Sequence, residues 1–160
     1  MQVSEIMSQP PITCPVDAGL DAPARLMWEF DCGIILVVGD DRRLVGVVTD
    51  RDICMAAYMH HKPLHLIPLG KVMSEPVISV QGGEDLLAAE HLMRDNRIRR
   101  LPVTDDGGRP VGVIALHDVA RTAVRSGQAD HDREIVETVA AVSTPASTNA
   151  PASRPPVRVG

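Results

Sequence analysis

The feature that most constrains the fold of this chain is an internal repeat. Residues 6–57 align with residues 72–123 without a gap, and the identical positions fall in blocks. Two generic amphipathic segments would not share a gapless register of this length, so the chain is predicted to fold as two copies of one unit. The shared blocks are Met-Ser-x-Pro-x-Ile at 7–12 and 73–78, Leu-x-Ala at 20–22 and 86–88, Leu-Met at 26–27 and 92–93, and Val-Gly-Val at 45–47 and 111–113.

Each copy predicts the same order of elements, strand–helix–strand–strand–helix. In the first copy, Asp17 is predicted to cap the first helix, because a side-chain oxygen satisfies the free amides at a helix start. The strands of this copy are predicted at 12–14, 34–38 and 44–48, and its helices at 18–30 and 50–59. In the second copy the strands are predicted at 77–80, 100–104 and 110–115, and the helices at 84–96 and 116–126.

These elements predict a mixed α/β (α+β) fold in which two β-α-β-β-α repeats pack face to face with pseudo-twofold symmetry. One copy alone is near the size at which a single core is marginal, so the pair is expected to form one obligate module. The tail is rich in Pro, Ala, Ser and Thr and is expected to be disordered. The predicted parts are repeat 1 at 3–60, a linker at 61–70, repeat 2 at 71–127, a C-terminal helix at 128–142 and the tail at 143–160.

Composition excludes several classes of protein. The 160 residues include one Trp, one Tyr and one Phe, and the net charge is −5. Single-stranded nucleic acid needs several stacking aromatics and a basic surface, so nucleic acid is not an expected partner. The three cysteines form no Cys-x-x-Cys pair, which favours reduced thiols in a cytoplasmic protein. No signal peptide and no apolar run of membrane-spanning length are present, so no membrane association is expected.

The sharpest local motif is Gly-Val-Val-Thr-Asp-Arg-Asp at 46–52, where a strand turns directly into a helix. Thr49 and Asp52 occupy the N-cap and N3 positions, which by themselves indicate a capping box. The second copy has Ala115 in place of the threonine but keeps Asp118. A carboxylate kept without its capping hydroxyl favours a second role, binding ribose hydroxyls beside a helix N-terminus that attracts phosphate.

The doubled Met-Ser-x-Pro turn, the run Gly-Val-Val-Thr-Asp-Arg-Asp-Ile at 46–53 and Arg-Arg-Leu-Pro-Val at 99–103 together resemble a CBS-domain pair, or Bateman module. The resemblance covers about residues 3–123, and the chain is similar to short stand-alone bacterial proteins of this family. It implies a non-enzymatic regulatory sensor with two clefts between the repeats. The implied regulatory ligand is AMP, ADP, ATP, NAD or S-adenosylmethionine, no cofactor is required, and the signal passes to an unknown effector protein in trans.

The resemblance also implies roles for individual residues. Carboxylates hold ribose hydroxyls, the backbone of the first strand of each copy reads the adenine edge, and hydroxyl or basic side chains contact ribose or phosphate. In that order, the implied nucleotide-binding residues are Asp52 and Asp118; Ile12, Thr13, Ile78 and Ser79; and Thr49, Arg51, Arg99, Arg100 and His117.

Two departures from the family pattern favour a single competent site. Ala115 stands where the family has Thr or Ser, which weakens the site of Asp118. The first copy has Gly33-Ile34 where the second has the arginine pair, so the basic residues lie on one side only. The expected competent site therefore combines Thr49, Asp52 and the two arginines.

Trp28 and Phe30 mark a place where the copies differ, because their counterparts are Arg94 and Asn96. The neighbouring Leu-Met pair is shared and belongs to the core, so position 28 is expected on the outer helix face. Trp is enriched at interface hot spots, and these two residues are predicted to anchor a homodimer. The alternative is an exposed tryptophan without a partner.

No metal or catalytic residue is predicted. His60, His61 and His65 lie in a loop with a proline and no nearby cysteine or carboxylate, which disfavours metal binding. No nucleophile elbow, P-loop or dinucleotide glycine motif is present. The alternative function, from a different class, is a protein-interaction or structural CBS module with degenerate pockets.

Overall fold

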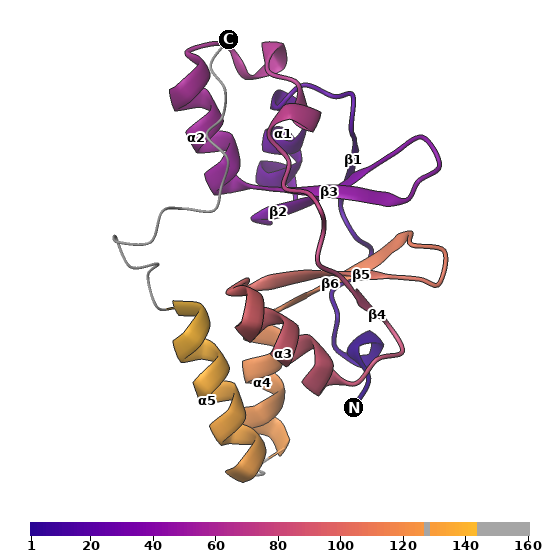
Figure 1. Cartoon of the computed structure of the whole chain (residues 1–160), viewed down its shortest axis with the longest axis vertical. Helices are drawn as coiled ribbons and strands as arrows, with labels where there is room; N and C mark the ends of the chain where they lie inside the picture. Colours follow the sequence, from indigo (N-terminus) through magenta and orange to yellow (C-terminus); the bar gives the residue numbers. More distant parts are fainter. Residues whose placement is uncertain (127–128, 144–160) are drawn as a thin grey trace.

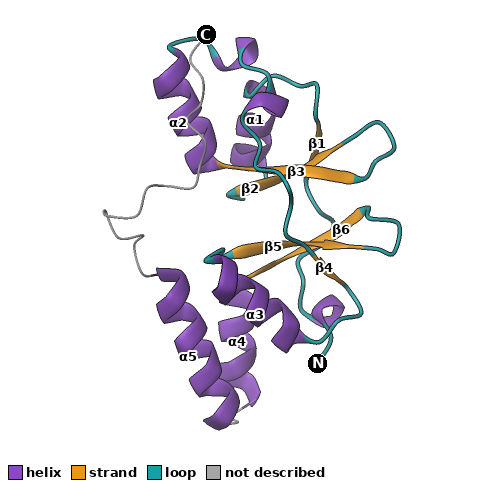
Figure 2. Cartoon of the chain, viewed as in Figure 1, coloured by secondary structure: helices purple, strands orange, loops and turns teal. Residues whose placement is uncertain are grey.

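The computed structural model describes residues 1–126 and 129–143, which form two stacked halves, one for each repeat (Figure 1). Each half is a three-stranded sheet with helices on its outer face, and the two sheets face each other in the middle (Figure 2). The first half contains β1 (Thr13–Pro15), α1 (Asp21–Glu29), β2 (Ile34–Val38), β3 (Leu44–Thr49) and α2 (Asp50–His60). The second half contains β4 (Val80–Gln81), α3 (Leu86–Asn96), β5 (Arg100–Thr104), β6 (Pro110–Ala115), α4 (Leu116–Ser126) and α5 (Ala129–Ser143). The predicted α/β fold is confirmed.

The two sheets repeat each other down to a local irregularity. In the first sheet, β2 lies between a parallel β1 and an antiparallel β3, and β5 has the same central place in the second. The first four residues of β2 are buried, because helices cover one face of this strand and the other sheet faces its second side. The register shift at Val37/Val38 recurs at Val103/Thr104, the equivalent step of β5.

The segment before each repeat packs into the opposite half. Val3 is fully buried in the core of the second half, and Met7 packs against the same core. Ile67 is buried in the core of the first half, where Met73 also packs. Each hydrophobic core therefore includes residues that precede the other repeat in the sequence.

Backbone hydrogen bonds fix this crossed arrangement. The Ser8 amide donates to the Val113 carbonyl at 2.8 Å, and the Val113 amide donates back at 3.0 Å. At the equivalent place, the Ser74 amide donates to the Val47 carbonyl at 2.8 Å, and the return bond is 3.3 Å long. The two segments are thus pinned to β6 and β3 by the same pair of bonds.

The repeated methionine and glycine of the sequence blocks meet across the two halves. Met7 packs over Gly112, and a Cβ atom at Gly112 would lie 2.6 Å from the Met7 sulfur and 2.9 Å from the Ser8 carbonyl oxygen. Met73 packs over Gly46 in the same way. Glycine is therefore required in both Val-Gly-Val blocks, because the crossing segment leaves no room for a side chain.

The predicted start of the first helix is wrong. The helix α1 begins at Asp21, and Asp17 does not cap it, because the residue before the helix is Leu20. The Leu20 amide instead donates to the carbonyls of Leu64 and Ile67, so the connecting segment uses the backbone that would have formed another helical turn.

Other predicted boundaries move by a few residues. The strand β1 lies one residue later than predicted, and the strand predicted at 77–80 is reduced to β4, because residues 74–77 first turn away from β3. The helix α3 starts at Leu86, two residues later than predicted, since the Asp85 side chain caps it by accepting the Leu87 amide at 3.0 Å. The predicted C-terminal helix is α5, and the tail beyond Ser143 lies outside the described residues.

The outer faces of the two halves are covered differently. The helix α5 lies along α3 and α4, with Ile135 buried against the core of the second half (Figure 1). On the first half, four large apolar side chains of α1, α2 and the residue after α1 stay exposed. This apolar set of the first repeat is Trp28 (89% exposed), Phe30 (56%), Met55 (44%) and Tyr58 (70%).

Candidate functional site

The carboxylate of Asp52 lies where β3 turns into α2. Thr49 caps the helix, and its hydroxyl donates to Asp52 Oδ2 at 2.6 Å. The Thr49 amide donates to the same oxygen at 3.0 Å, and the Asp52 amide donates to Thr49 Oγ1 at 3.3 Å. The predicted capping box is thus present and fixes the carboxylate between sheet and helix. A role of Asp52 toward ribose stays a prediction.

The carboxylate of Asp118 has a different set of partners at the equivalent junction. Its Oδ2 accepts the Ala115 amide at 3.0 Å, while its Oδ1 pairs with Arg121 Nη2 and His117 Nε2, each at 3.2 Å. The sequence-based argument that Asp118 loses its capping purpose together with the hydroxyl is wrong, because the backbone half of the box remains. Two basic side chains of α4 also face this carboxylate.

The crossed segments decide which predicted residues belong together. Ser74 pairs with Val47, two residues before the end of β3, so segment 75–79 starts beside the junction of Asp52. By the equivalent pairing, segment 9–13 starts beside the junction of the second repeat. The predicted adenine contacts of the second copy therefore lie with the carboxylate of the first, and the reverse.

A hollow of about 630 Å³ borders segment 75–79 on the side of the β2–β3 and β5–β6 hairpins. Leu44 and Thr49 are the two ends of β3, about 17 Å apart, so this hollow and the Asp52 carboxylate lie toward opposite ends of the strand. Among the predicted site residues, Ser79 lines it. The lining residues are Leu44, Val45, Glu75, Pro76, Val77, Ser79, Thr104 and Gly108. Sequence reasoning did not assign the other seven, although the repeated Met-Ser-x-Pro block pointed to this segment.

The backbone carbonyls expected to read adenine are not equivalent in the two copies. The Ile12 carbonyl accepts the Leu36 amide at 3.1 Å, so this carbonyl already has a partner in β2. The residue equivalent to Leu36 is Pro102, which has no amide proton. The strand β5 therefore offers the carbonyl of Ile78 no donor at this position.

The side chain of Arg100 crosses from the second sheet to the first. Its Nη2 lies 3.0 Å, and its Nη1 3.3 Å, from the position of a Cβ atom on Gly33. Gly33 precedes Ile34, which pairs with Thr49 in the sheet. The guanidinium of the second repeat therefore lies within about two residues of the helix cap that holds Asp52.

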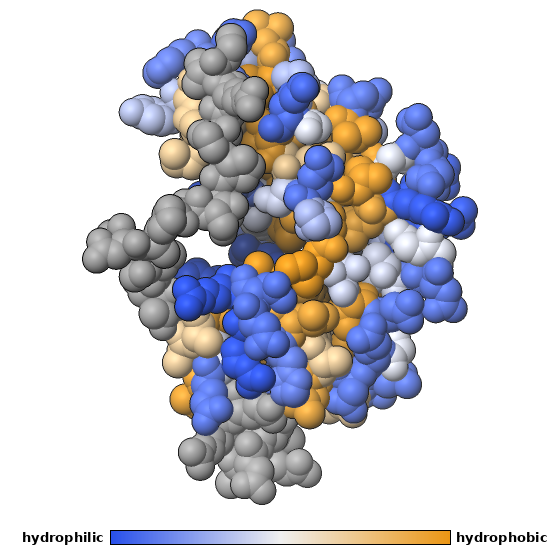
Figure 3. All heavy atoms as spheres, viewed as in Figure 1, coloured by the Kyte–Doolittle hydropathy of each residue, from blue (hydrophilic) through white to orange (hydrophobic). Residues whose placement is uncertain are grey.

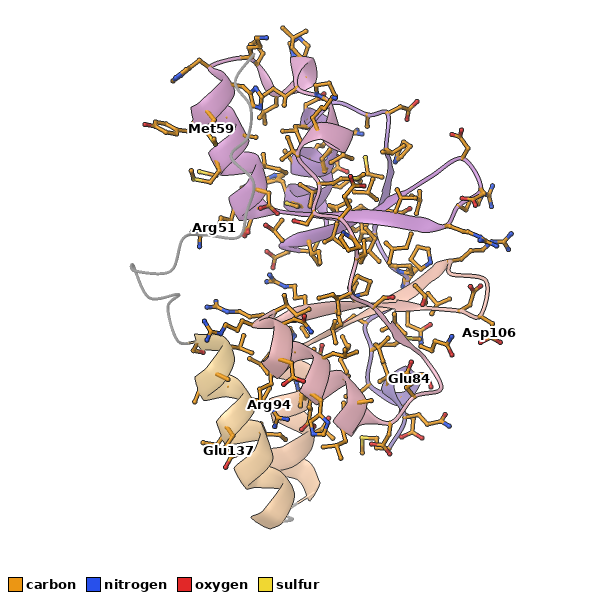
Figure 4. The ribbon with its side chains drawn as sticks, in the orientation of Figure 1. Arg51, Met59, Glu84, Arg94, Asp106 and Glu137 are labelled. Carbon is orange, nitrogen blue, oxygen red and sulfur yellow. The ribbon has the colours of Figure 1, made fainter. Side chains whose placement is uncertain are left out.

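Other basic residues lie at the same edge of the molecule, opposite the hairpins. Arg99 and Arg100 are exposed at the start of β5, and the Arg99 carbonyl accepts the Leu116 amide at 2.9 Å. Arg51 is exposed in the first turn of α2, on the side of the first half toward the second (Figure 4). Strongly hydrophilic atoms gather where β5 begins (Figure 3). This edge is the part of the site suited to an anion.

Within residues 1–126 and 129–143, no group of three or more His, Cys, Asp or Glu side chains is arranged to hold a metal ion. Among the linker histidines, the ring of His61 packs edge-on against Tyr58, with centroids 6.0 Å apart. No helix in the part of the chain that the structure describes is long and apolar enough to cross a membrane.

The fold and the crossed junctions define a protein made of two interlocked repeats around ligand-sized recesses. The CBS domain family model matches residues 3–58 and 69–125, one match for each repeat, so the chain belongs to the CBS domain family. An uncharacterized protein of Methanopyrus kandleri is 29% identical over 120 residues, which are 74% of this chain and 61% of that protein. Inosine-5′-monophosphate dehydrogenase of Mycobacterium tuberculosis is 35% identical over 113 residues, but the match spans 20% of that enzyme.

Solved structures give the same assignment. A CBS domain protein of Pyrobaculum aerophilum in complex with AMP has a TM-score of 0.71 at 25% identity, covering 79% of this chain and 97% of that one. A CBS domain pair in complex with 5′-methylthioadenosine and S-adenosyl-L-methionine has a TM-score of 0.71 at 25% identity, with 79% and 98% covered. Hypoxic response protein I, with two coordinated zinc ions, has a TM-score of 0.69 at 27% identity, with 76% and 98% covered.

Proposed function

We propose that this chain is a cytoplasmic regulatory sensor that binds an adenosine-containing ligand between its repeats and carries out no catalytic step itself. The main support is the junction at Asp52, where segment 75–79 and Arg100 of the second repeat both reach β3 and β2 of the first. The adenosine-containing ligands of related CBS pairs support the choice of ligand class.

In this proposal, the Asp52 carboxylate holds the ribose hydroxyls, and Thr49 keeps that carboxylate in place through the capping box. The base lies along segment 75–79, among the aliphatic side chains of Val45 and Val77. A ligand held this way touches both halves, so its binding energy favours one packing of the two sheets over others. A partner protein that recognises this packing would then receive the signal in trans.

Ligand-induced thermal stabilisation tests the proposal. AMP, ADP, ATP, NAD and S-adenosylmethionine are added separately, and a ligand at about 100 times its Kd stabilises the fold by about 2.7 kcal/mol. That gain raises Tm by roughly 5–10 °C for a chain of this size. Asp52→Ala should abolish the shift, measured against its own unliganded Tm, while Asp118→Ala keeps it. A shift that survives in Asp52→Ala would mean that the ligand binds elsewhere.

A second candidate function is a protein-interaction module with degenerate pockets. The contacts of Asp118 favour it for the second junction, because this carboxylate already pairs with Arg121 and His117. The absence of a thermal shift with all five compounds would favour this function for the whole chain.

We also propose that the chain forms a homodimer through α1 and α2. The support is the apolar set of the first repeat, whose Trp28 is 89% exposed, while the matching face of the second repeat is covered by α5. An exposed tryptophan beside other large apolar side chains is typical of an interface.

Exchanging residues between the copies tests the dimer. Trp28→Arg introduces the residue found at the equivalent position 94 and should convert the dimer to a monomer in light scattering at micromolar concentration. Val136→Arg is the control, because Val136 is 66% exposed on α5 and lies outside the proposed interface. A monomeric natural chain, or a Trp28→Arg variant that stays dimeric, would contradict the proposal.

A further inference from the structure

Arg100 supplies a positive charge to the repeat that lacks one. Its backbone belongs to the second sheet, where it pairs with Ala115, but its guanidinium lies against Gly33 of the first half. In the part of the chain that the structure describes, no ion pair to Arg100 is found. The position equivalent to Arg100 in the first copy is Ile34, so no side chain returns a charge to the second junction.

The charges around the two carboxylates are therefore arranged in opposite ways. At the second junction, His117 and Arg121 are paired with Asp118 itself, and both belong to the same helix. At the first junction, the Asp52 carboxylate is held by the amide and hydroxyl of Thr49, while the guanidinium of Arg100 comes from the opposite sheet. A ligand with a negatively charged end finds a cation that is not already paired with the site carboxylate at the first junction.

The backbone adds a second, independent difference. The crossed pairing places Ile78 with the junction of Asp52, and Pro102 offers its carbonyl no amide. At the other junction the Ile12 carbonyl is bonded to the Leu36 amide at 3.1 Å. The exocyclic amine of adenine is a hydrogen-bond donor, so the first junction has an acceptor at the position where the second has a completed bond.

We infer that this chain binds one phosphorylated adenosine nucleotide, at the junction of Asp52, in preference to uncharged adenosines such as 5′-methylthioadenosine. The phosphate lies between Arg100 and the exposed arginines at the start of β5, and the adenine amine donates to the Ile78 carbonyl. This inference rests on the proposed function and adds to it the ligand's charge, its number and the residue that selects it.

Isothermal titration calorimetry with four probes tests the inference: AMP, ATP, adenosine and 5′-methylthioadenosine. The natural chain should bind AMP and ATP at one site per chain and at least about tenfold more tightly than the two uncharged compounds, as expected for one charge-assisted hydrogen bond. The preference should weaken as salt concentration rises.

Arg100→Ala should remove most of the tenfold preference and leave the affinity for adenosine unchanged. Arg109→Ala is the matched control, because it removes an exposed arginine of the same repeat at the hairpin end. Equal affinities for AMP and 5′-methylthioadenosine, two sites per chain, or a preference that survives in Arg100→Ala would overturn the inference and leave the proposed function standing. Absence of binding by all four probes would overturn both.

Discussion

The two repeats have the same strands, helices and sheet order, yet they differ at nearly every position that could contact a ligand or a partner. What they share is structural: the methionine that packs over the opposite glycine, and the serine that pairs with the opposite strand. What they do not share lies at the junctions and on the outer helices, where Thr49 faces Ala115, Ile34 faces Arg100 and Trp28 faces Arg94. The comparison separates residues that hold the halves together from residues that give each half its own task.

The largest expected effect concerns the helix that covers only the second repeat. Ile135→Ala removes buried methyl and methylene groups from the core beneath α5 and should lower the free energy of unfolding by about 2–4 kcal/mol in urea denaturation. Val136→Ala, at the exposed neighbouring position, should stay within about 0.5 kcal/mol. Equal effects of the two substitutions would mean that α5 is not part of the core.

The next effect compares the two crossing points. Gly112→Ala forces a methyl group against the Ser8 carbonyl oxygen, 2.9 Å away, and should cost about 1–3 kcal/mol. Gly46→Ala meets only side-chain atoms of Met73, which can move, so its cost should be smaller. Gly83→Ala is the control, with no atom within 4 Å of the added methyl group. A larger cost at Gly46 than at Gly112 would reverse the ranking of the two crossings.

A smaller effect follows from exchanging the helix caps. Thr49→Ala gives the first repeat the cap of the second and should cost about 1 kcal/mol, since the hydroxyl contacts to Asp52 are lost. Ala115→Thr is the reverse exchange and should raise Tm by a few degrees. Thermal melts measure both, and a neutral Thr49→Ala would show that the hydroxyl does not stabilise α2.

The smallest effect lies at a buried thiol. Burial, and to a lesser extent the carboxylates of Asp17 and Asp21, raise the pKa of Cys14, while Arg25 opposes the shift. The folded state therefore favours the neutral thiol, and its contribution to stability is present below the unfolded-state pKa of about 8.5 and is lost as pH rises toward the folded value.

Cys14→Val introduces the residue of the equivalent position 80, which is also buried, and should change stability at pH 7 by less than about 1.5 kcal/mol. Between pH 7 and pH 9.5, the natural chain should lose more stability in urea than the variant does. Identical pH profiles of the two proteins would contradict the assignment of this loss to Cys14.

The sequence allowed the repeat, the order of elements and the capping box at Thr49 to be predicted, because each depends on residues close together in the chain. It did not allow the crossing to be predicted. Met7 is equally compatible in sequence with Gly46 and with Gly112, and only the path of the backbone decides that it packs over Gly112. The cap at Asp17 was wrong for a related reason, since Leu20 spends its amide on a distant segment.

Side-chain direction limited the prediction of the site in the same way. The arginine pair was expected near phosphate, but its sequence position places it in the second repeat, and the reach of Arg100 to Gly33 is a property of the packed halves. The difference between Ile12 and Ile78 was also hidden, because it depends on which β5 residue faces the carbonyl, and that residue is a proline without an amide.

The crossed N-terminal segment has a consequence for folding during synthesis. Domains generally fold as units as they leave the ribosome, the N-terminal one first. Here the first half can close once residues 67–73 are available, but Val3 and Met7 have their packing partners in the second half. The earliest residues to be translated are therefore among the last to be packed, and the N-terminal segment must wait, exposed, until β6 with Gly112 has emerged.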